Sequence, residues 1–365
     1  MLPLNYIIFM PYGFLLFSMT VFGTLYSLSA SHWLAVWAGL EINLIAFIPL
    51  MLYRGTVLET ESAIKYFIFQ AVGSALIMLG SLLSLGPDFI WSLSTNGVML
   101  SLEKGVIILI IGLLLKLGAF PFHFWFPSVA GGISWFSNLL LFTWQKIAPL
   151  FLFFLLMCAW QAILMVPIML AVVGSSIIGG IGGINQTQLR ALLAYSSIAH
   201  MGWMLFCSYL SETSVKLYLS IYFFITACIF LLAWSTEMNL IFQAFSSFLG
   251  KNSMLRSVVM LLLLSLGGIP PLLGFVPKWV VLNLSEPTGL TITVMALILG
   301  SLFSLFYYLA LVFSTFFSAG PLLMKNMTLT MSTTKSTYGL ISASVIVNLM
   351  GGLAILMNFY MESFL

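Results

Sequence analysis

Runs of about 20 apolar residues follow one another along most of this chain, and they limit its fold more than any other feature. A run of this length lets one α-helix cross the hydrocarbon core of a membrane. The runs lack the alternation of apolar and polar residues that lipid-facing β-strands show. Charged residues make up 6% of the 365 residues, against about 25% in soluble domains, so the chain could not cover a water-facing surface. We therefore predict an all-α polytopic membrane protein.

Hydropathy predicts about eleven transmembrane helices in a single domain over residues 1–365. The fourth and the ninth are expected to be discontinuous, because glycine and proline interrupt them at 118–121 and at 267–271. The expected ranges are about 5–28, 32–52, 62–85, 105–126, 134–157, 161–183, 189–210, 214–234, 257–283, 288–317 and 338–360.

Each interrupted helix is the fourth in a block of five, which predicts an inverted repeat. The first five-helix repeat would cover about 5–157 and the second about 161–317, followed by a C-terminal helix at about 338–360. Because five is odd, the second block would lie upside down relative to the first. Paired broken helices of this kind surround an ion site near the membrane midplane. The alternative is two unrelated proline kinks.

A few charged residues lie inside the apolar runs, and we expect Glu41, Lys116, Lys146 and Lys278 to lie deepest. A lysine at the centre of a spanning helix costs roughly 2.5–3.5 kcal/mol, so each one needs a reason. Lys65 is a weaker candidate, since it lies about one turn into its predicted helix and could reach the interface. With three deep lysines and one deep acid, at least one lysine should be able to change its protonation state. We predict a proton path; the alternative is structural ion pairing or contact with a neighbouring subunit.

Histidines and cysteines offer no metal or haem framework. His123 and His200 could relay protons, because imidazole titrates near neutrality, or they could be ordinary hydrogen-bonded histidines. Cys158, Cys207 and Cys228 are widely spaced and form no CxxC pair. The chain also has no nucleotide-binding glycine loop after a strand, so we expect it to bind no cofactor or metal itself. Its net charge of +3 is too small to indicate nucleic acid.

Lysines and arginines are shared unevenly between the predicted loops. The loops after even-numbered helices carry six of them and those after odd-numbered helices carry two. By the positive-inside rule, the N-terminus should face the inside and the C-terminus the outside. The first residues lack the features of a secretory signal or transit peptide, so we expect co-translational insertion.

Six segments between about residue 28 and 279 are informative together: LSASHWLAVWAGLEINLIAFIPL, AIKYFIFQA, KLGAFPFHFWFP, LLLFTWQKIAPL, GGINQTQLRALLAYSSIAHMGWM and LSLGGIPPLLGFVPKW. They resemble the antiporter-like membrane-arm subunits of respiratory complex I, NADH:ubiquinone oxidoreductase. The resemblance implies a proton-translocating subunit in the mitochondrial inner membrane, driven by electron transfer from NADH to ubiquinone in other subunits. It implies that Glu41 pairs with Lys116, that Lys146 is the central relay and that Lys278 lies toward the exit.

The resemblance also implies partners: the other membrane-arm subunits, including neighbouring antiporter-like ones, and lipids. The chain itself would carry no redox centre, and the whole complex would use NADH and ubiquinone. One departure is Ser128, which stands where relatives usually carry an acid. Two alternatives remain open at this point, a subunit of a cation/proton antiporter complex and a structural spacer that merely holds the membrane arm together.

Overall fold

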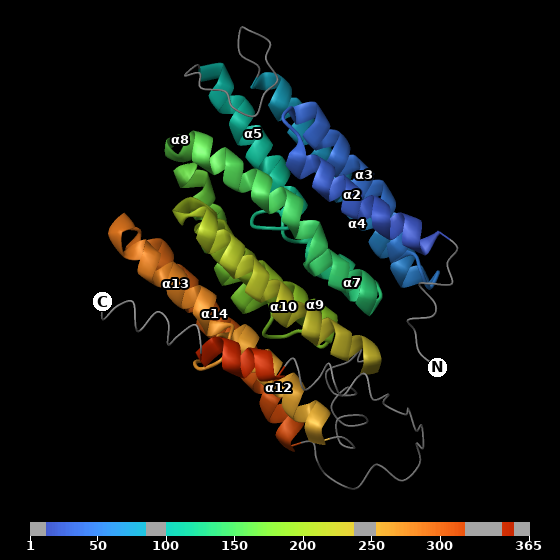
Figure 1. The fold of residues 1–365 in the computed structure, drawn as a ribbon, viewed down its shortest axis with the longest axis vertical. Helices are drawn as coiled ribbons and strands as arrows, with labels where there is room; N and C mark the ends of the chain where they lie inside the picture. The colour runs from blue at the N-terminus through green and yellow to red at the C-terminus, as the bar shows by residue number, and fades with distance from the viewer. Residues whose placement is uncertain (1–11, 85–99, 237–252, 318–344, 354–365) are drawn as a thin grey trace. The chain divides into compact units, whose positions relative to one another are not determined.

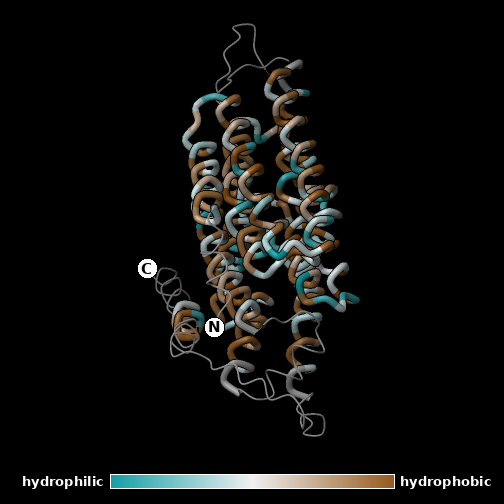
Figure 2. The backbone as a smooth tube through the Cα atoms, turned by 90° about the vertical axis from the view of Figure 1, so that its right-hand side faces the viewer, coloured by the Kyte–Doolittle hydropathy of each residue, from teal (hydrophilic) through white to brown (hydrophobic). Residues whose placement is uncertain are grey.

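The computed structural model describes residues 12–84, 100–236, 253–317 and 345–353, and helices make up nearly all of these ranges (Figure 1). The all-α prediction is confirmed. The chain forms two compact units, residues 1–175 and 176–365. Figure 2 shows that apolar residues cover most helical turns and that polar residues interrupt them at scattered points.

The first unit begins with three helices that lie side by side in Figure 1, α2 (Gly13–Ser29), α3 (Trp33–Met51) and α4 (Val57–Leu83). Close approach of α2 and α3 depends on Gly39, where an added Cβ would lie 2.7 Å from the backbone nitrogen of Ser27. The remaining helices are α5 (Leu100–Leu117), α6 (Trp125–Gly132), α7 (Trp135–Phe142) and α8 (Trp144–Gly182), and α8 continues into the second unit.

The second unit contains a similar series of helices and one short 3₁₀ turn. Residues 345–353 are also helical, although most of the predicted range 338–360 lies outside the described residues. The helices are α9 (Leu189–Leu210), α10 (Glu212–Thr236), α12 (Ser253–Gly267), α13 (Phe275–Ser285), η1 (Glu286–Thr288) and α14 (Thr291–Phe317).

Within the described ranges, six helical segments are long and apolar enough to cross a membrane. The segment from Trp135 to Gly182 has 48 residues, which is enough for two crossings at about 20 residues each. Its backbone leaves helical geometry at Trp160, with φ −131° and ψ 32°, between the two predicted ranges 134–157 and 161–183. The polytopic membrane fold is therefore confirmed.

Both predicted helix interruptions are confirmed. The chain leaves helix between α5 and α6 and again between α12 and α13, and each interruption starts with a glycine at positive φ, Gly118 at 66° and Gly268 at 80°. These values lie in the left-handed region that favours glycine. The inverted relation of the two blocks stays a prediction.

Several boundaries differ from the predicted ranges by a few residues, and the predicted start of the first helix, at about residue 5, lies outside the described residues. Two of the differences have a local cause. The third helix begins at Val57 rather than at about residue 62, because Thr56 accepts a hydrogen bond from the backbone N–H of Glu59 and caps the helix. The fifth is divided at Thr143, whose hydroxyl donates to the carbonyl of Leu139 at 2.6 Å. This division begins α8 only two residues before Lys146.

Candidate functional site

Two side chains donate hydrogen bonds to backbone carbonyls at the end of α5, where the helix is interrupted. The indole N–H of Trp125 donates to the carbonyl of Leu115 at 3.1 Å, across the non-helical segment. The amide of Gln70 on α4 donates to the carbonyl of Lys116 at 3.2 Å. Backbone at membrane depth is tolerated outside a helix only when protein or water supplies such partners. The interruption is therefore a fixed feature of the first unit, and it positions Lys116.

Lys116 and Lys146 are both buried, with 7% and 3% of their surface exposed, and both line one cavity in the first unit. The cavity is large enough to admit a water molecule, and its polar lining could bind one. The two lysines thus share one polar cavity in the first unit, and the proton path stays a prediction. The polar lining consists of Asn43, Tyr66, Gln70, Lys116, Gln145 and Lys146.

Aromatic rings surround the ammonium group of Lys146. Its Nζ lies 5.3 Å from the ring centre of Phe126 and 5.6 Å from that of Phe142. A cation over an aromatic face gains about 0.5–2 kcal/mol, which offsets part of the burial cost. Phe126 also lines the cavity, so the same ring contacts the lysine and the shared space.

An amide pair that the sequence analysis missed joins α3 to α8 at this cavity. Asn43 donates to the Oε1 of Gln145 at 2.7 Å, and Gln145 donates back to the Oδ1 of Asn43 at 2.9 Å. The hydroxyl of Tyr66 lies 3.5 Å from the same Oε1. The sequence signal was weak but present, since Asn43 stands two residues after Glu41 and Gln145 directly before Lys146.

Glu41 is half-buried and so less enclosed than the three lysines, and its depth in the membrane stays a prediction. It acts electrostatically on Lys116, although no ion pair within 4.0 Å joins these two described residues. Among the acids of the first unit whose burial the structure describes, Glu59 is buried; it is 2% exposed and accepts the backbone N–H of Arg54 at 2.8 Å. Glu59 therefore stabilises the start of α4, and the expected pairing of Glu41 with Lys116 is an electrostatic influence rather than a contact.

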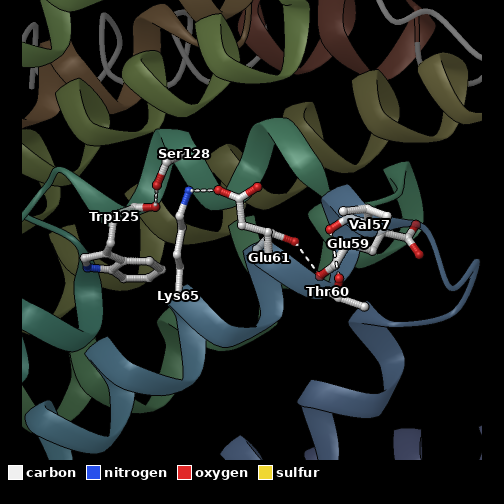
Figure 3. Close-up of polar contacts among 8 residues, drawn as sticks. Val57, Glu59, Thr60, Glu61, Lys65, Trp125 and Ser128 are labelled. Carbon is white, nitrogen blue, oxygen red and sulfur yellow. Dashed lines mark hydrogen bonds and ion pairs between the residues drawn. The ribbon is translucent and has the colours of Figure 1, made fainter.

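Lys65 lies outside the cavity group, and Figure 3 shows it beside Glu61 on α4. Its Nζ lies 2.6 Å from a carboxylate oxygen of Glu61, and the two side chains are 43% and 57% exposed. Ser128 on α6 donates its hydroxyl to the carbonyl of Trp125 at 2.8 Å. The serine that replaces the usual acid thus bonds within its own helix, and Lys65 has its carboxylate partner one turn away.

Lys278 is a buried lysine in the second unit, with 7% of its surface exposed. Its Nζ donates to the carbonyl of Gly267 at 2.9 Å, so the side chain bridges from α13 back to the end of α12. An added Cβ on Gly268 would lie 2.9 Å from this Nζ. Positive φ and the absence of a side chain at Gly268 therefore leave the space that Lys278 occupies.

The two predicted relay histidines lie in different units. His123 is 5% exposed in the segment between α5 and α6, where its Nδ1 lies 3.3 Å from the carbonyl of Pro121. His200 on α9 is 9% exposed, and its Nδ1 lies 2.9 Å from the hydroxyl of Tyr218 on α10. Tyr218 was not predicted, and the His–Tyr pair gives each group a partner that can either donate or accept. Among the described residues, no three of His, Cys, Asp and Glu could hold a metal ion together.

Comparison with known proteins identifies related sequences over most of the chain. The family model described as NADH:quinone oxidoreductase/Mrp antiporter, transmembrane, matches residues 30–304. NADH-ubiquinone oxidoreductase chain 2 of Oryctolagus cuniculus is 36% identical over 312 residues, covering 85% of this chain and 88% of that protein. The protein of the same name from Squalus acanthias is 41% identical over 304 residues, covering 82% and 84%.

Solved structures share the fold. A chain of respiratory complex I from Thermus thermophilus with bound aureothin superposes with a TM-score of 0.81 at 26% identity, covering 93% of this chain and 77% of that one. A chain of the Mrp complex from Dietzia sp. DQ12-45-1b gives a TM-score of 0.76 at 16% identity, covering 82% and 59%. At that identity the second likeness shows the fold alone.

Proposed function

The chain belongs to the NADH:quinone oxidoreductase/Mrp antiporter membrane family, and we propose that it is a proton-translocating membrane-arm subunit of an NADH:ubiquinone oxidoreductase. One observation carries the proposal beyond family membership: Lys116 and Lys146 are buried and line one cavity that can admit water. A spacer has no need of two ammonium groups in an apolar unit, where each costs roughly 2.5–3.5 kcal/mol.

In the first unit, proton transfer would use the two lysines and water in the cavity. A neutral lysine amine can accept a proton, and its charged ammonium form can donate one. Either lysine can therefore exchange a proton with a water molecule that lies between them. The charge of Glu41 would bias this exchange, because Glu41 acts on Lys116 without a fixed contact. A small movement of α3 relative to α5 would then change how strongly the carboxylate favours the charged form of Lys116.

In the second unit, Lys278 would be the corresponding proton-transfer group. Its ammonium donates to a carbonyl at the end of α12, which holds the charge in place without an acid. His200 with Tyr218 offers a second group that can exchange a proton. His123 would serve the same purpose beside the interruption of the first unit. We propose that the chain contains two inverted five-helix repeats, over about 5–157 and 161–317, followed by a C-terminal helix at about 338–360.

Electron transfer would take place in other subunits of the complex, which would use NADH and ubiquinone. The partners of this chain would be the neighbouring membrane-arm subunits, including antiporter-like ones, and lipids. The location would be the mitochondrial inner membrane. The excess of basic residues in the loops after even-numbered helices supports an N-terminus on the matrix side and a C-terminus on the intermembrane-space side.

The test replaces Lys116 or Lys146 by Met in the assembled complex. Positioned proton-transfer groups contribute roughly 100-fold or more to rate, so the proton flux through this subunit should fall by about that factor. The measurement is the number of protons moved per NADH oxidised in sealed vesicles. Lys65→Met is the matched control, because Lys65 is in the same unit but exposed. Unchanged pumping in both cavity variants, with normal assembly, would favour the spacer alternative.

A further inference from the structure

The amide pair of Asn43 and Gln145 has a chemistry different from that of the two lysines beside it. Each side chain donates to the oxygen of the other, at 2.7 Å and 2.9 Å, so the two amides form a closed ring of hydrogen bonds. Asn43 is buried and Gln145 half-buried, and both line the cavity of Lys116 and Lys146. The ring is thus part of the polar surface over which any water between the lysines would extend.

A carboxamide conducts protons poorly because its roles are fixed. Its nitrogen only donates and its oxygen only accepts, whereas water, a hydroxyl or an amine can do both. While the ring is closed, two of the four amide N–H groups and one acceptor position of each oxygen are used within the pair. Water that entered to connect the lysines would have to compete with these hydrogen bonds.

The pair also belongs to a set of hydrogen bonds that joins the start of α8 to α2 and α3. Trp144, the residue before Gln145, donates its indole N–H to the hydroxyl of Thr24 at 3.1 Å. The first two residues of α8 are therefore bonded to α2 and α3, directly before Lys146. Asn43 lies on the same helix as Glu41, so a shift of α3 that moves this carboxylate also strains the amide ring. The hydroxyl of Tyr66 already donates to the Oε1 of Gln145, at 3.5 Å, and this bond can remain when the ring opens.

We propose that the Asn43–Gln145 pair is a gate for proton exchange between Lys116 and Lys146. Closed, the amide ring keeps the lysines from being connected through water; open, it yields its hydrogen-bonding groups to water that bridges them. Asn43 and Gln145 are positioning residues in this scheme, since neither takes up the proton. The gate rests on the proposed proton-translocating function and deepens it.

The test compares two substitutions at the same position in the assembled complex, in sealed vesicles. Gln145→Ala removes the amide and leaves space for water, whereas Gln145→Leu removes it and fills the space with an apolar group. Without NADH, an imposed pH gradient should decay at least twofold faster in the Ala variant and at the normal rate in the Leu variant. During NADH oxidation, the Leu variant should pump fewer protons per NADH. Asn43→Ala should reproduce the leak from the other side of the pair.

Ser137→Ala is the matched control, because it removes another buried hydrogen bond to α3, at 3.0 Å to the carbonyl of Leu50, away from the cavity lining. A purely structural pair predicts that the Ala and Leu variants lose assembled complex alike and leave passive proton decay unchanged, which would overturn the gate. Lys116→Met, measured alongside, separates the two proposals. If Lys116→Met stops pumping while neither Ala variant leaks protons, the gate is refuted and the proton-translocating function stands. If Lys116→Met pumps normally, the gate and the proton-translocating function are both refuted.

Discussion

Replacing Lys278 by Met separates a structural from a functional role for this buried lysine in the second unit. The ammonium of Lys278 donates to the carbonyl of Gly267 at 2.9 Å, and the side chain is 7% exposed. Met has a similar length and no charge. The substitution therefore removes the donor while the space beside Gly268 stays filled.

Two energies of similar size oppose each other in this variant. A buried carbonyl that loses its donor costs about 1–3 kcal/mol. Against this, a lysine inside a spanning helix costs roughly 2.5–3.5 kcal/mol, and the Met variant is relieved of that cost. The difference between the two ranges from a loss of about 0.5 kcal/mol to a gain of about 2.5 kcal/mol in the stability of the Met variant. The variant should therefore insert and assemble about as well as the natural chain, or better.

The assay measures assembled complex on a native gel and protons moved per NADH in vesicles. We expect normal assembly with a clear loss of pumping. Lys216→Met is the control in the same unit, since Lys216 is 58% exposed and pairs with Glu212 on the surface of α10. A Met variant that does not assemble would refute the energetic argument. One that assembles and pumps normally would remove Lys278 from the proton path.

The other predictions concern α4 and the contact of α2 with α3. Glu61→Gln should change stability by less than about 1 kcal/mol, because its ion pair with Lys65 is exposed, and should leave protons per NADH unchanged. A loss of pumping in Glu61→Gln would indicate that Lys65 takes part in proton transfer. Gly39→Ala should destabilise the chain by about 1–3 kcal/mol, because the added Cβ would lie 2.7 Å from the nitrogen of Ser27 and overpack the helix contact. A melting temperature equal to that of the natural chain would show that α2 and α3 separate at no cost.

Most helix positions were predictable because apolar length alone defines them. The helix expected at 189–210 is observed as α9 with the same ends, and that expected at 32–52 is α3, Trp33–Met51. The start of α4 was missed although its signal stands in the sequence, since Thr56 and Glu59 have the spacing of a capping box. The division at Thr143 has no comparable signal, because neither glycine nor proline marks it.

The candidate site was predictable only in part. Burial of Lys116, Lys146 and Lys278 followed from their places inside apolar runs, and the structure confirms it. The half-buried state of Glu41 did not follow, because it depends on which helices cover α3. The bond between Asn43 and Gln145 joins residues 102 positions apart, and no local pattern predicts a contact of that range.

The three buried lysines share one structural circumstance that explains why a charge can be kept at these points. Lys116 precedes Gly118 by two residues, Lys146 follows the division at Thr143 by three, and Lys278 is the fourth residue of α13. Where a helix ends, its terminal carbonyls and N–H groups lack intrahelical partners and must find side chains or water. An ammonium can be such a partner, as Lys278 is for Gly267. Helix interruptions in a membrane thus supply both the polar groups that stabilise a buried lysine and the water that would let it exchange a proton.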